Sequence, residues 1–522
     1  MLTERILLIQ VGDDLVPATL PEALARLCDG SLTGFDGLAA HQRHGWELFL
    51  YQTTALALAR AGEAEAATDE AAWLALADPE GWRDRLAALT PGCADTAWSL
   101  VVDDLARPAL LQPPLPSSTM QGYSEIGGTP DEIDVLITAK GHDVKPARVG
   151  AAEPRHWLYA LVTLQTMQGY SGRGNFGIAR MNGGFGSRPL LMVSPSQDLP
   201  ARFLRGVQAA LAARDDQLAV HGGYYRADGL PLLWLEPWDT ETSLGLQELD
   251  PLFVEVCRRV RLVRGADSRI AAWGRPSTVA RVDVPDTAKG SLGDAWTPLV
   301  GGAALTVGPG GFTYKRLSEL LAGQDVTQPV AMEVPDGYNG KAWLHAAVLV
   351  RGQGKTEGLY ERWLEIPRAV TGAFRRGGPR ADLGRLGKAM VDDAGNARRA
   401  LRLGLAAFLQ GGAETLDFDD DRPGEWLDRL DQGIGDIFFP HLFSRFEDDK
   451  TPTGRAAWLA ALTTLTRRLF AEATTRLSPP ENRRERALAI ASLMFGSALR
   501  KAQLIPPKEQ DKKEDESMDL VQ

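Results

Sequence analysis

The chain has 522 residues, of which 44% are hydrophobic and 24% charged, and its formal net charge at pH 7 is −11. This composition is typical of a globular protein with more than one domain, and the acidic balance argues against a free-standing nucleic-acid binder, since phosphate binding depends on Lys and Arg. The sequence contains neither an apolar run long enough for a membrane helix nor a basic-then-apolar leader, so we expect a cytoplasmic protein without a membrane partner.

The sequence carries no recognisable metal or catalytic signature. Cys28, Cys93 and Cys257 lie far apart without C-x-x-C spacing, and we expect them to be reduced structural thiols. The seven histidines are scattered, and the acidic stretch 417–421 lacks the glycine and glutamate that a calcium loop requires at its sixth and twelfth positions. We therefore expect no metal and no cofactor.

The first third of the chain predicts short strands and helices. Apolar residues with helical periodicity predict a helix over 41–61, with Trp46, Phe49, Leu50 and Leu56 on one face. The other predicted elements are a strand over 6–11, a helix over 21–27, a strand over 133–138, a basic loop over 139–149, and a helix over 153–168 with Gly169 as its C-cap.

Residues 169–189, GYSGRGNFGIARMNGGFGSRP, contain seven glycines and three arginines. Glycine at this density lets a backbone adopt positive φ and approach a ligand closely. A dinucleotide-binding fingerprint needs a strand before the glycines and a helix after them, whereas here a helix precedes and a strand over 190–193 follows. Two interpretations stay open: a loop in which Arg173, Arg180 and Arg188 help to hold a nucleic-acid backbone, and a cluster of structural turns.

The segment 346–363, AAVLVRGQGKTEGLYERW, contains the Gly-Lys-Thr end of a Walker phosphate loop. The first Walker glycine is replaced by Leu349, and the alternating residues 360–366 predict a strand where a Walker loop would begin a helix. We therefore predict two strands joined by a cationic turn. Three roles stay open: a solvated hairpin, a tip that contacts phosphates and base edges, and a phosphate-handling enzyme that transfers phosphoryl or nucleotidyl groups with Lys355.

From about residue 369 the pattern changes to long helices near 385–411 and 424–447, followed by two helices with apolar stripes. The stripes are Trp458, Leu462, Leu465 and Leu469, then Leu488, Ser492, Phe495 and Leu499. Such stripes are typical of a bundle core. We predict an α+β protein: a large irregular mixed α/β domain over 1–368, a C-terminal four-helix bundle over 369–506, and a disordered charged tail over 507–522.

The order of these features resembles the CasA-type large subunit of Cascade, the type I-E CRISPR surveillance complex of antiviral defence. The resemblance covers most of the chain and is carried by HQRHGWELFLYQTTALALA, RPALLQPPLP, TAKGHDVK, GNFGIARMNGGFGSRP, GDAWTP and RGQGKTEGLYERW. It implies a non-catalytic subunit that binds the 5′ handle of the guide RNA, recognises the PAM in double-stranded target DNA and starts R-loop formation. It also implies contacts with the backbone, small and handle-binding subunits, and with a helicase–nuclease or a nuclease fused elsewhere.

The resemblance also assigns residues. It matches the turn Gln353, Gly354, Lys355 and Thr356 to the family's wedge and groove-reading segment, with Gln353 or Thr356 as the wedge. It matches Gly174, Asn175 and Gly177 to a loop that lies against the PAM minor groove, and Lys289 to a further groove-reading lysine. The loop that docks on the RNA handle would use Lys140, His142, Lys145 and Arg148. Some relatives carry a zinc-like cysteine cluster in mid-chain, which this sequence lacks.

Overall fold

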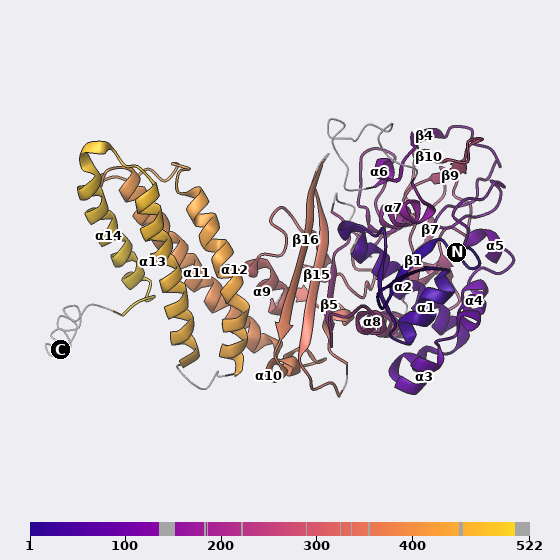
Figure 1. Cartoon of the computed structure of the whole chain (residues 1–522), viewed down its shortest axis with the longest axis horizontal. Helices are drawn as coiled ribbons and strands as arrows, with labels where there is room; N and C mark the ends of the chain where they lie inside the picture. Colours follow the sequence, from indigo (N-terminus) through magenta and orange to yellow (C-terminus); the bar gives the residue numbers. More distant parts are fainter. Residues whose placement is uncertain are drawn as a thin grey trace. The chain divides into compact units, whose positions relative to one another are not determined.

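The computed structural model of the chain describes residues 1–134, 152–181, 184, 186–220, 223–288, 290–323, 325–335, 337–352, 355–447 and 453–506 (Figure 1). The chain forms two compact units. The first comprises Met1–Phe312 and Asp325–Ile366, and the second comprises the described parts of Thr313–Gln324 and Pro367–Gln522. The first unit mixes sheets and helices and the second is helical, so the predicted α+β class is confirmed.

A small sheet and two helices open the first unit. Strands β1 (Leu7–Val11), β2 (Asp14–Ala18) and β3 (Leu32–Phe35) form an antiparallel sheet in the order β2-β1-β3. Helix α1 (Leu20–Cys28) begins at a capping box, in which the Thr19 hydroxyl accepts from the Glu22 amide and the Glu22 carboxylate accepts from the Thr19 amide. Helix α2 (Ala40–Ala61) follows, and the strand and both helices predicted here are confirmed.

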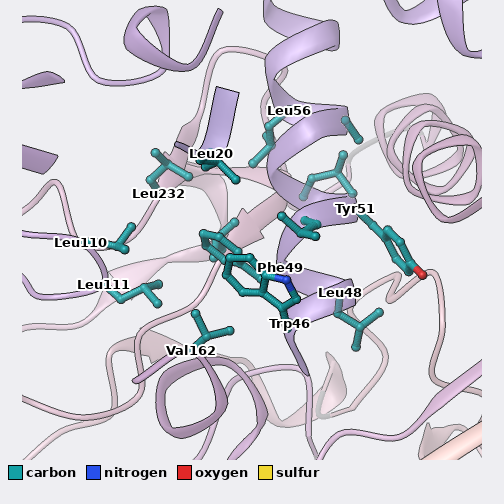
Figure 2. Close-up of a cluster of buried hydrophobic side chains, with 14 of the residues drawn as sticks. Leu20, Trp46, Leu48, Phe49, Tyr51, Leu56, Leu110, Leu111, Val162 and Leu232 are labelled. Carbon is teal, nitrogen blue, oxygen red and sulfur yellow. The ribbon is translucent and has the colours of Figure 1, made fainter. Parts of the chain in front are cut away.

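Helix α2 lies in the centre of the core of this unit (Figure 2). The Trp46 ring packs against Phe35, Phe49 and Tyr159, with centroid distances of 5.4, 5.6 and 5.2 Å. The predicted apolar face is buried, but so is the opposite face, where Glu47 forms an ion pair with Arg202 at 2.5 Å. Each fully buried large apolar side chain contributes roughly 1.5–3 kcal/mol, so the buried apolar residues of α2 contribute substantially to the stability of the unit.

The sheet that bears on function contains three antiparallel strands in the order β16-β15-β5. Strand β15 (Ala342–Gly352) pairs with β16 (Lys355–Ile366) along its whole length, whereas β5 (Leu190–Ser194) pairs only with residues 343–347 of β15. Leu190, at the start of β5, pairs with Ala347, so the glycine-rich segment enters β5 from the end of the sheet that carries the hairpin tip. The predicted hairpin and the predicted strand at 190–193 are confirmed.

Shorter elements complete the first unit. The remaining helices are α3 (Glu70–Ala75), α4 (Pro79–Ala88), α5 (Ala94–Ala97), α6 (Pro130–Ile133), α7 (Pro154–Met167) and α8 (Leu199–Ala219). Two further sheets have three strands each: one has the order β4 (Ser124–Gly127), β10 (Ile270–Gly274) and β9 (Val260–Arg264), and the other has the order β13 (Ala303–Ala304), β12 (Leu299–Val300) and β14 (Val326–Thr327). Two sheets have two strands each: β6 (Leu230–Leu232) pairs with β8 (Leu249–Val254), and β7 (Leu244–Gly245) pairs with β11 (Val282–Asp283).

The second unit is built on four long helices, which are α11 (Arg380–Leu409), α12 (Gly424–Glu447), α13 (Thr453–Arg476) and α14 (Arg484–Lys501). α11 packs against the other three, as well as against α9 (Tyr314–Ala322), which comes from much earlier in the chain; α10 (Arg368–Thr371) packs against α12. Asp431 of α12 anchors α9 by accepting from the Tyr314 hydroxyl at 3.0 Å and from Lys315 at 3.1 Å. The predicted helical C-terminal region is confirmed, whereas the place of α9 in it was not predicted.

Three local predictions are wrong. The strand predicted over 133–138 is wrong at its start, where Ile133 ends helix α6, because Thr129, Pro130 and Glu132 form a helix N-terminus with a capping box. The rest of that prediction, and the basic loop predicted after it, fall within residues 135–151, outside the described part. Gly169 does not cap α7, which ends at Met167 and continues in extended backbone at Gln168. In α14 the buried stripe is Ala487, Ala491, Phe495 and Leu499, since small side chains let α14 approach α11 closely, and Ser492 is exposed.

Candidate nucleic-acid interface

The glycine-rich segment leaves α7 and forms a tight turn before it reaches β5. The Asn175 amide donates to the Gly172 carbonyl at 2.9 Å, and the Ser171 amide donates to the Asn175 carbonyl at 2.9 Å. Gly174 has a φ of +80° and its carbonyl accepts from the Ser277 amide at 3.0 Å. A side chain at Gly174 would meet Pro276, so this turn depends on glycine for both its backbone conformation and its packing.

Gly177 serves a packing role. A Cβ atom at this position would lie 2.6 Å from the backbone carbonyl carbon of Gly169 and from the backbone nitrogen of Tyr170. The Ile178 amide donates to the Gln168 carbonyl at 3.0 Å, and this bond holds the two ends of the loop together. The close approach of backbone to backbone therefore explains this glycine without a ligand.

Two of the three arginines in the segment are buried and form ion pairs inside the protein. Arg180 is 3% exposed and pairs with Glu255 at 3.0 Å, and Arg188 is 1% exposed and forms a two-bond ion pair with Asp294 at 2.7 Å. The interpretation that these arginines hold a nucleic-acid backbone is wrong, because neither guanidinium is accessible. Arg173, at the turn itself, is exposed.

The Arg258 guanidinium holds the glycine turn through hydrogen bonds to its backbone. Its Nη2 donates to the Gly169 carbonyl at 3.0 Å, and its Nη1 donates to the Phe176 carbonyl on the other side of the turn. Gln165 of α7 holds the Arg258 backbone, donating to its carbonyl at 2.9 Å and accepting from its amide at 2.8 Å. The turn is thus positioned by a buried cation whose bonds go to carbonyl oxygens.

The hairpin tip is shaped by an irregularity in β16. Val350 pairs with Gly358 and Arg351 pairs with Thr356, so Glu357 is an extra residue on one strand, and Gly358 has a φ of +133°. Such a bulge re-aims the end of a hairpin. Gln353 and Gly354 lie outside the described residues, as does the side chain of Lys355, whose backbone begins β16. Thr356 is half-buried.

The base of this tip lies close to the glycine turn. Burial lowers the pKa of the Arg351 guanidinium, and the nearby charge of Arg258 lowers it further. Among the described residues, neither arginine forms an ion pair with a carboxylate. Two like charges therefore lie near each other here: Arg258 is buried and bonded to backbone carbonyls, whereas Arg351, at the base of the tip, is half-buried. Sequence reasoning missed both arginines; Arg351 lay inside the quoted hairpin motif as a cation in an otherwise apolar strand.

The structure places Gly174, Asn175 and Gly177 in the segment that Arg258 holds, and Arg258 lies near Arg351, which pairs with Thr356 at the base of the tip. Of the remaining predicted residues, Lys355 is described only in its backbone, and the others lie outside the described part of the chain: Lys140, His142, Lys145, Arg148, Lys289, Gln353 and Gly354. Because Lys355 and Thr356 begin strand β16 in place of a helix, the Walker loop is excluded as predicted.

The described residues offer neither a metal centre nor a membrane span. Within the ranges given above, no group of three or more His, Cys, Asp and Glu side chains is placed to hold a metal ion. No helix in the same ranges has both the length and the apolar character needed to cross a bilayer. All three cysteines are free thiols, as predicted.

Solved structures share this architecture over nearly the whole chain. CasA of Thermus thermophilus is 16% identical with a TM-score of 0.62, and the match covers 95% of this chain and 98% of that protein. The chain has the CasA (Cse1) fold. Cse1 of Thermobifida fusca is likewise 16% identical with a TM-score of 0.62, covering 96% of this chain and 97% of that protein. A chain of a CRISPR RNA-guided surveillance complex is 12% identical with a TM-score of 0.55, covering 94% and 98%. No protein-family model and no curated protein sequence matches the chain.

The CasA fold includes both units, since the matches extend over 94–96% of this chain. This fold is shared at 12–16% sequence identity.

Proposed function

We propose that this chain is the non-catalytic large subunit of a type I-E Cascade complex, which recognises the PAM in double-stranded target DNA and starts strand separation. The CasA fold supports this role, as does the likeness to a chain of an RNA-guided surveillance complex. The partners would be the 5′ handle of the guide RNA, the target duplex, the other Cascade subunits, and a helicase–nuclease or a nuclease fused to another subunit.

The observation that carries the proposal is that Arg258, which holds the glycine turn, lies near Arg351 at the base of the hairpin tip. Arg258 bonds to the Phe176 carbonyl of the turn, and its charge acts on Arg351 at the base of the tip. In a chain with a net charge of −11, we assign the phosphate contact to Arg351, which is half-buried and has no carboxylate partner in the described part of the chain, whereas Arg258 is buried and positions the turn. Few such contacts are needed, since pairing with the guide RNA reads most of the target sequence.

The proposed contact of each residue follows from the chemistry of the DNA minor groove and of the nucleic-acid backbone. Gln353, Lys355 and Thr356 enter the minor groove, where amide and ammonium groups meet base-edge acceptors and a side chain inserts as a wedge. The turn at Gly174 and Asn175 lies against the DNA backbone, and Lys289 adds a further groove contact. Residues Lys140, His142, Lys145 and Arg148 dock on the RNA handle, and the helical unit contacts the small subunits and a DNA strand.

Electrophoretic mobility of PAM-containing duplexes with the assembled complex tests this function. Gln353→Ala and Lys355→Ala are each expected to weaken binding of the closed duplex about tenfold, the usual cost of one good contact, and to spare a pre-opened target. Lys341→Ala is the matched control, because Lys341 precedes β15 at the far end of the same hairpin, roughly 40 Å from the tip at strand geometry. Closed-duplex affinity that is equal in all three variants and the wild type would refute the role of the tip.

A further inference from the structure

A groove of about 860 Å³ runs along α13 and the end of α14 in the helical unit. Its apolar lining includes Leu459, Ala460 and Ile505, and its cations are Arg467, Arg500 and Lys501. Within the described part of the chain, none of these three cations takes part in an ion pair, and no carboxylate lines the groove. A surface of this kind suits a ligand that offers both negative charge and apolar side chains.

The chain itself is turned into this groove after α14. Gln503 has a φ of +55°, a conformation that side-chain-bearing residues seldom adopt, and it reverses the chain where the helix ends. Leu504 is then buried at 4% exposure, and its carbonyl accepts from the Thr463 hydroxyl of α13 at 3.2 Å. Pro506 also lines the groove, so the residues that follow it start at the site.

Residues 507–522 have the matching chemistry. They contain six acids and three lysines, a net charge of −3, with the acids Glu514, Asp515, Glu516 and Asp519 adjacent to the apolar Met518, Leu520 and Val521. The lining of the groove extends along α13 from residue 456 to residue 467, about 17 Å at helical rise, and roughly five extended residues span that length. These sixteen residues are therefore long enough to cover the groove.

We propose that the acidic segment 509–521 of this chain docks in the groove between α13 and α14, with its carboxylates on Arg467, Arg500 and Lys501. Attachment at Pro506 gives the segment an effective concentration on the order of millimolar at the groove, so weak contacts suffice to hold it. A nucleic-acid backbone would meet the cations but would leave the apolar lining without a partner.

Zero-length carbodiimide coupling of the full chain tests this docking, because it joins the Lys501 amine only to carboxylates that touch it. An equal mixture of ordinary and isotope-labelled chains distinguishes coupling within one chain from coupling between copies. The proposal predicts intramolecular links from Lys501 to acids within 509–519. In Arg467→Glu/Arg500→Glu their yield is expected to fall about fivefold, since several weak ion pairs are lost together. The control Arg486→Glu reverses an exposed charge on α14 outside the groove and is expected to keep the wild-type yield.

Circular dichroism of each variant checks that the helices are intact, so that a lost link reports docking. Absence of Lys501 links in the wild type would overturn the proposal, as would a yield that persists in Arg467→Glu/Arg500→Glu. Links found only between copies would make a second chain the occupant. If no intramolecular link forms, and single-stranded DNA binds equally well to the full chain and to a chain ending at Pro506, the groove is a nucleic-acid site.

Discussion

Arg351 and Arg258 lie near each other at the base of the hairpin tip, although about 90 residues separate them in the sequence. Burial and the charge of Arg258 both lower the pKa of Arg351, and Arg258 in turn holds the Gly169 and Phe176 carbonyls. The pair costs the folded protein electrostatic energy, because like charges in a partly buried site repel each other. A bound phosphate would offset that cost, which makes Arg351 the residue at which the proposed function and stability can be separated.

Arg351→Gln is therefore expected to weaken duplex binding by the assembled complex about tenfold and to reduce the salt slope of log K by about 1, as the loss of one phosphate contact requires. The Tm of the chain is expected to stay level or rise, since a like-charge repulsion is removed. Titrations at several salt concentrations and a thermal melt measure the two quantities. A lower Tm with unchanged DNA binding would assign Arg351 to structure.

Gly177→Ala is expected to destabilise the first unit by about 1–3 kcal/mol, because the new Cβ would overlap backbone atoms of Gly169 and Tyr170 that cannot rotate away. Thermal unfolding followed by circular dichroism measures the effect. Gly308→Ala is the control, since Gly308 has open space around it and no positive φ. Equal Tm values for the two variants would mean that the backbone approach at Gly177 is looser than described.

Arg188→Met is expected to destabilise the first unit by about 3–5 kcal/mol, because it leaves the buried carboxylate of Asp294 without its partner. The loss should appear in urea unfolding of the free chain without any DNA. Arg107→Met breaks the exposed ion pair with Asp95 and is expected to leave the unfolding midpoint unchanged. A stable Arg188→Met protein that fails only in DNA binding would restore Arg188 to the nucleic-acid interface.

His44 is expected to make stability depend on pH. Burial lowers its pKa from 6.5 to about 4, with a smaller effect from His345, and neither ring nitrogen has a hydrogen-bond partner among the described residues. The unfolded chain therefore binds a proton that the folded chain refuses between pH 6.5 and 4, so stability falls as the pH drops through that window, by up to about 3 kcal/mol. His44→Gln should flatten the fall in urea-unfolding free energy there. Parallel pH curves for variant and wild type would contradict this assignment.

Local sequence patterns were sufficient to predict the helices and strands whose formation depends on residues that are neighbours in the chain. The alternation after Thr356 correctly predicted a strand, and the periodicity from His41 correctly predicted α2. The strand predicted over 133–138 was wrong at Ile133, because a capping box a few residues earlier extends helix α6 to that residue.

The features that the sequence did not predict depend on contacts between residues far apart in the chain. Arg180 and Arg188 read as free cations in the sequence, since their partners Glu255 and Asp294 lie 75 and 106 residues away. The approach of the glycine turn to the hairpin depends on the pairing of Leu190 with Ala347, which no local pattern encodes.

Photo-crosslinking tests most directly whether the two loops act on one DNA segment. A benzoylphenylalanine placed at Asn175 and, in a separate chain, at Thr356 would be activated in the assembled complex bound to a PAM duplex, and the linked nucleotides mapped. Because the two loops meet at Arg258 and Arg351, both positions are predicted to link to the PAM and its adjoining base pairs, within about five base pairs of each other. Links separated by more than about one helical turn of DNA, or links from only one of the two positions, would contradict the account.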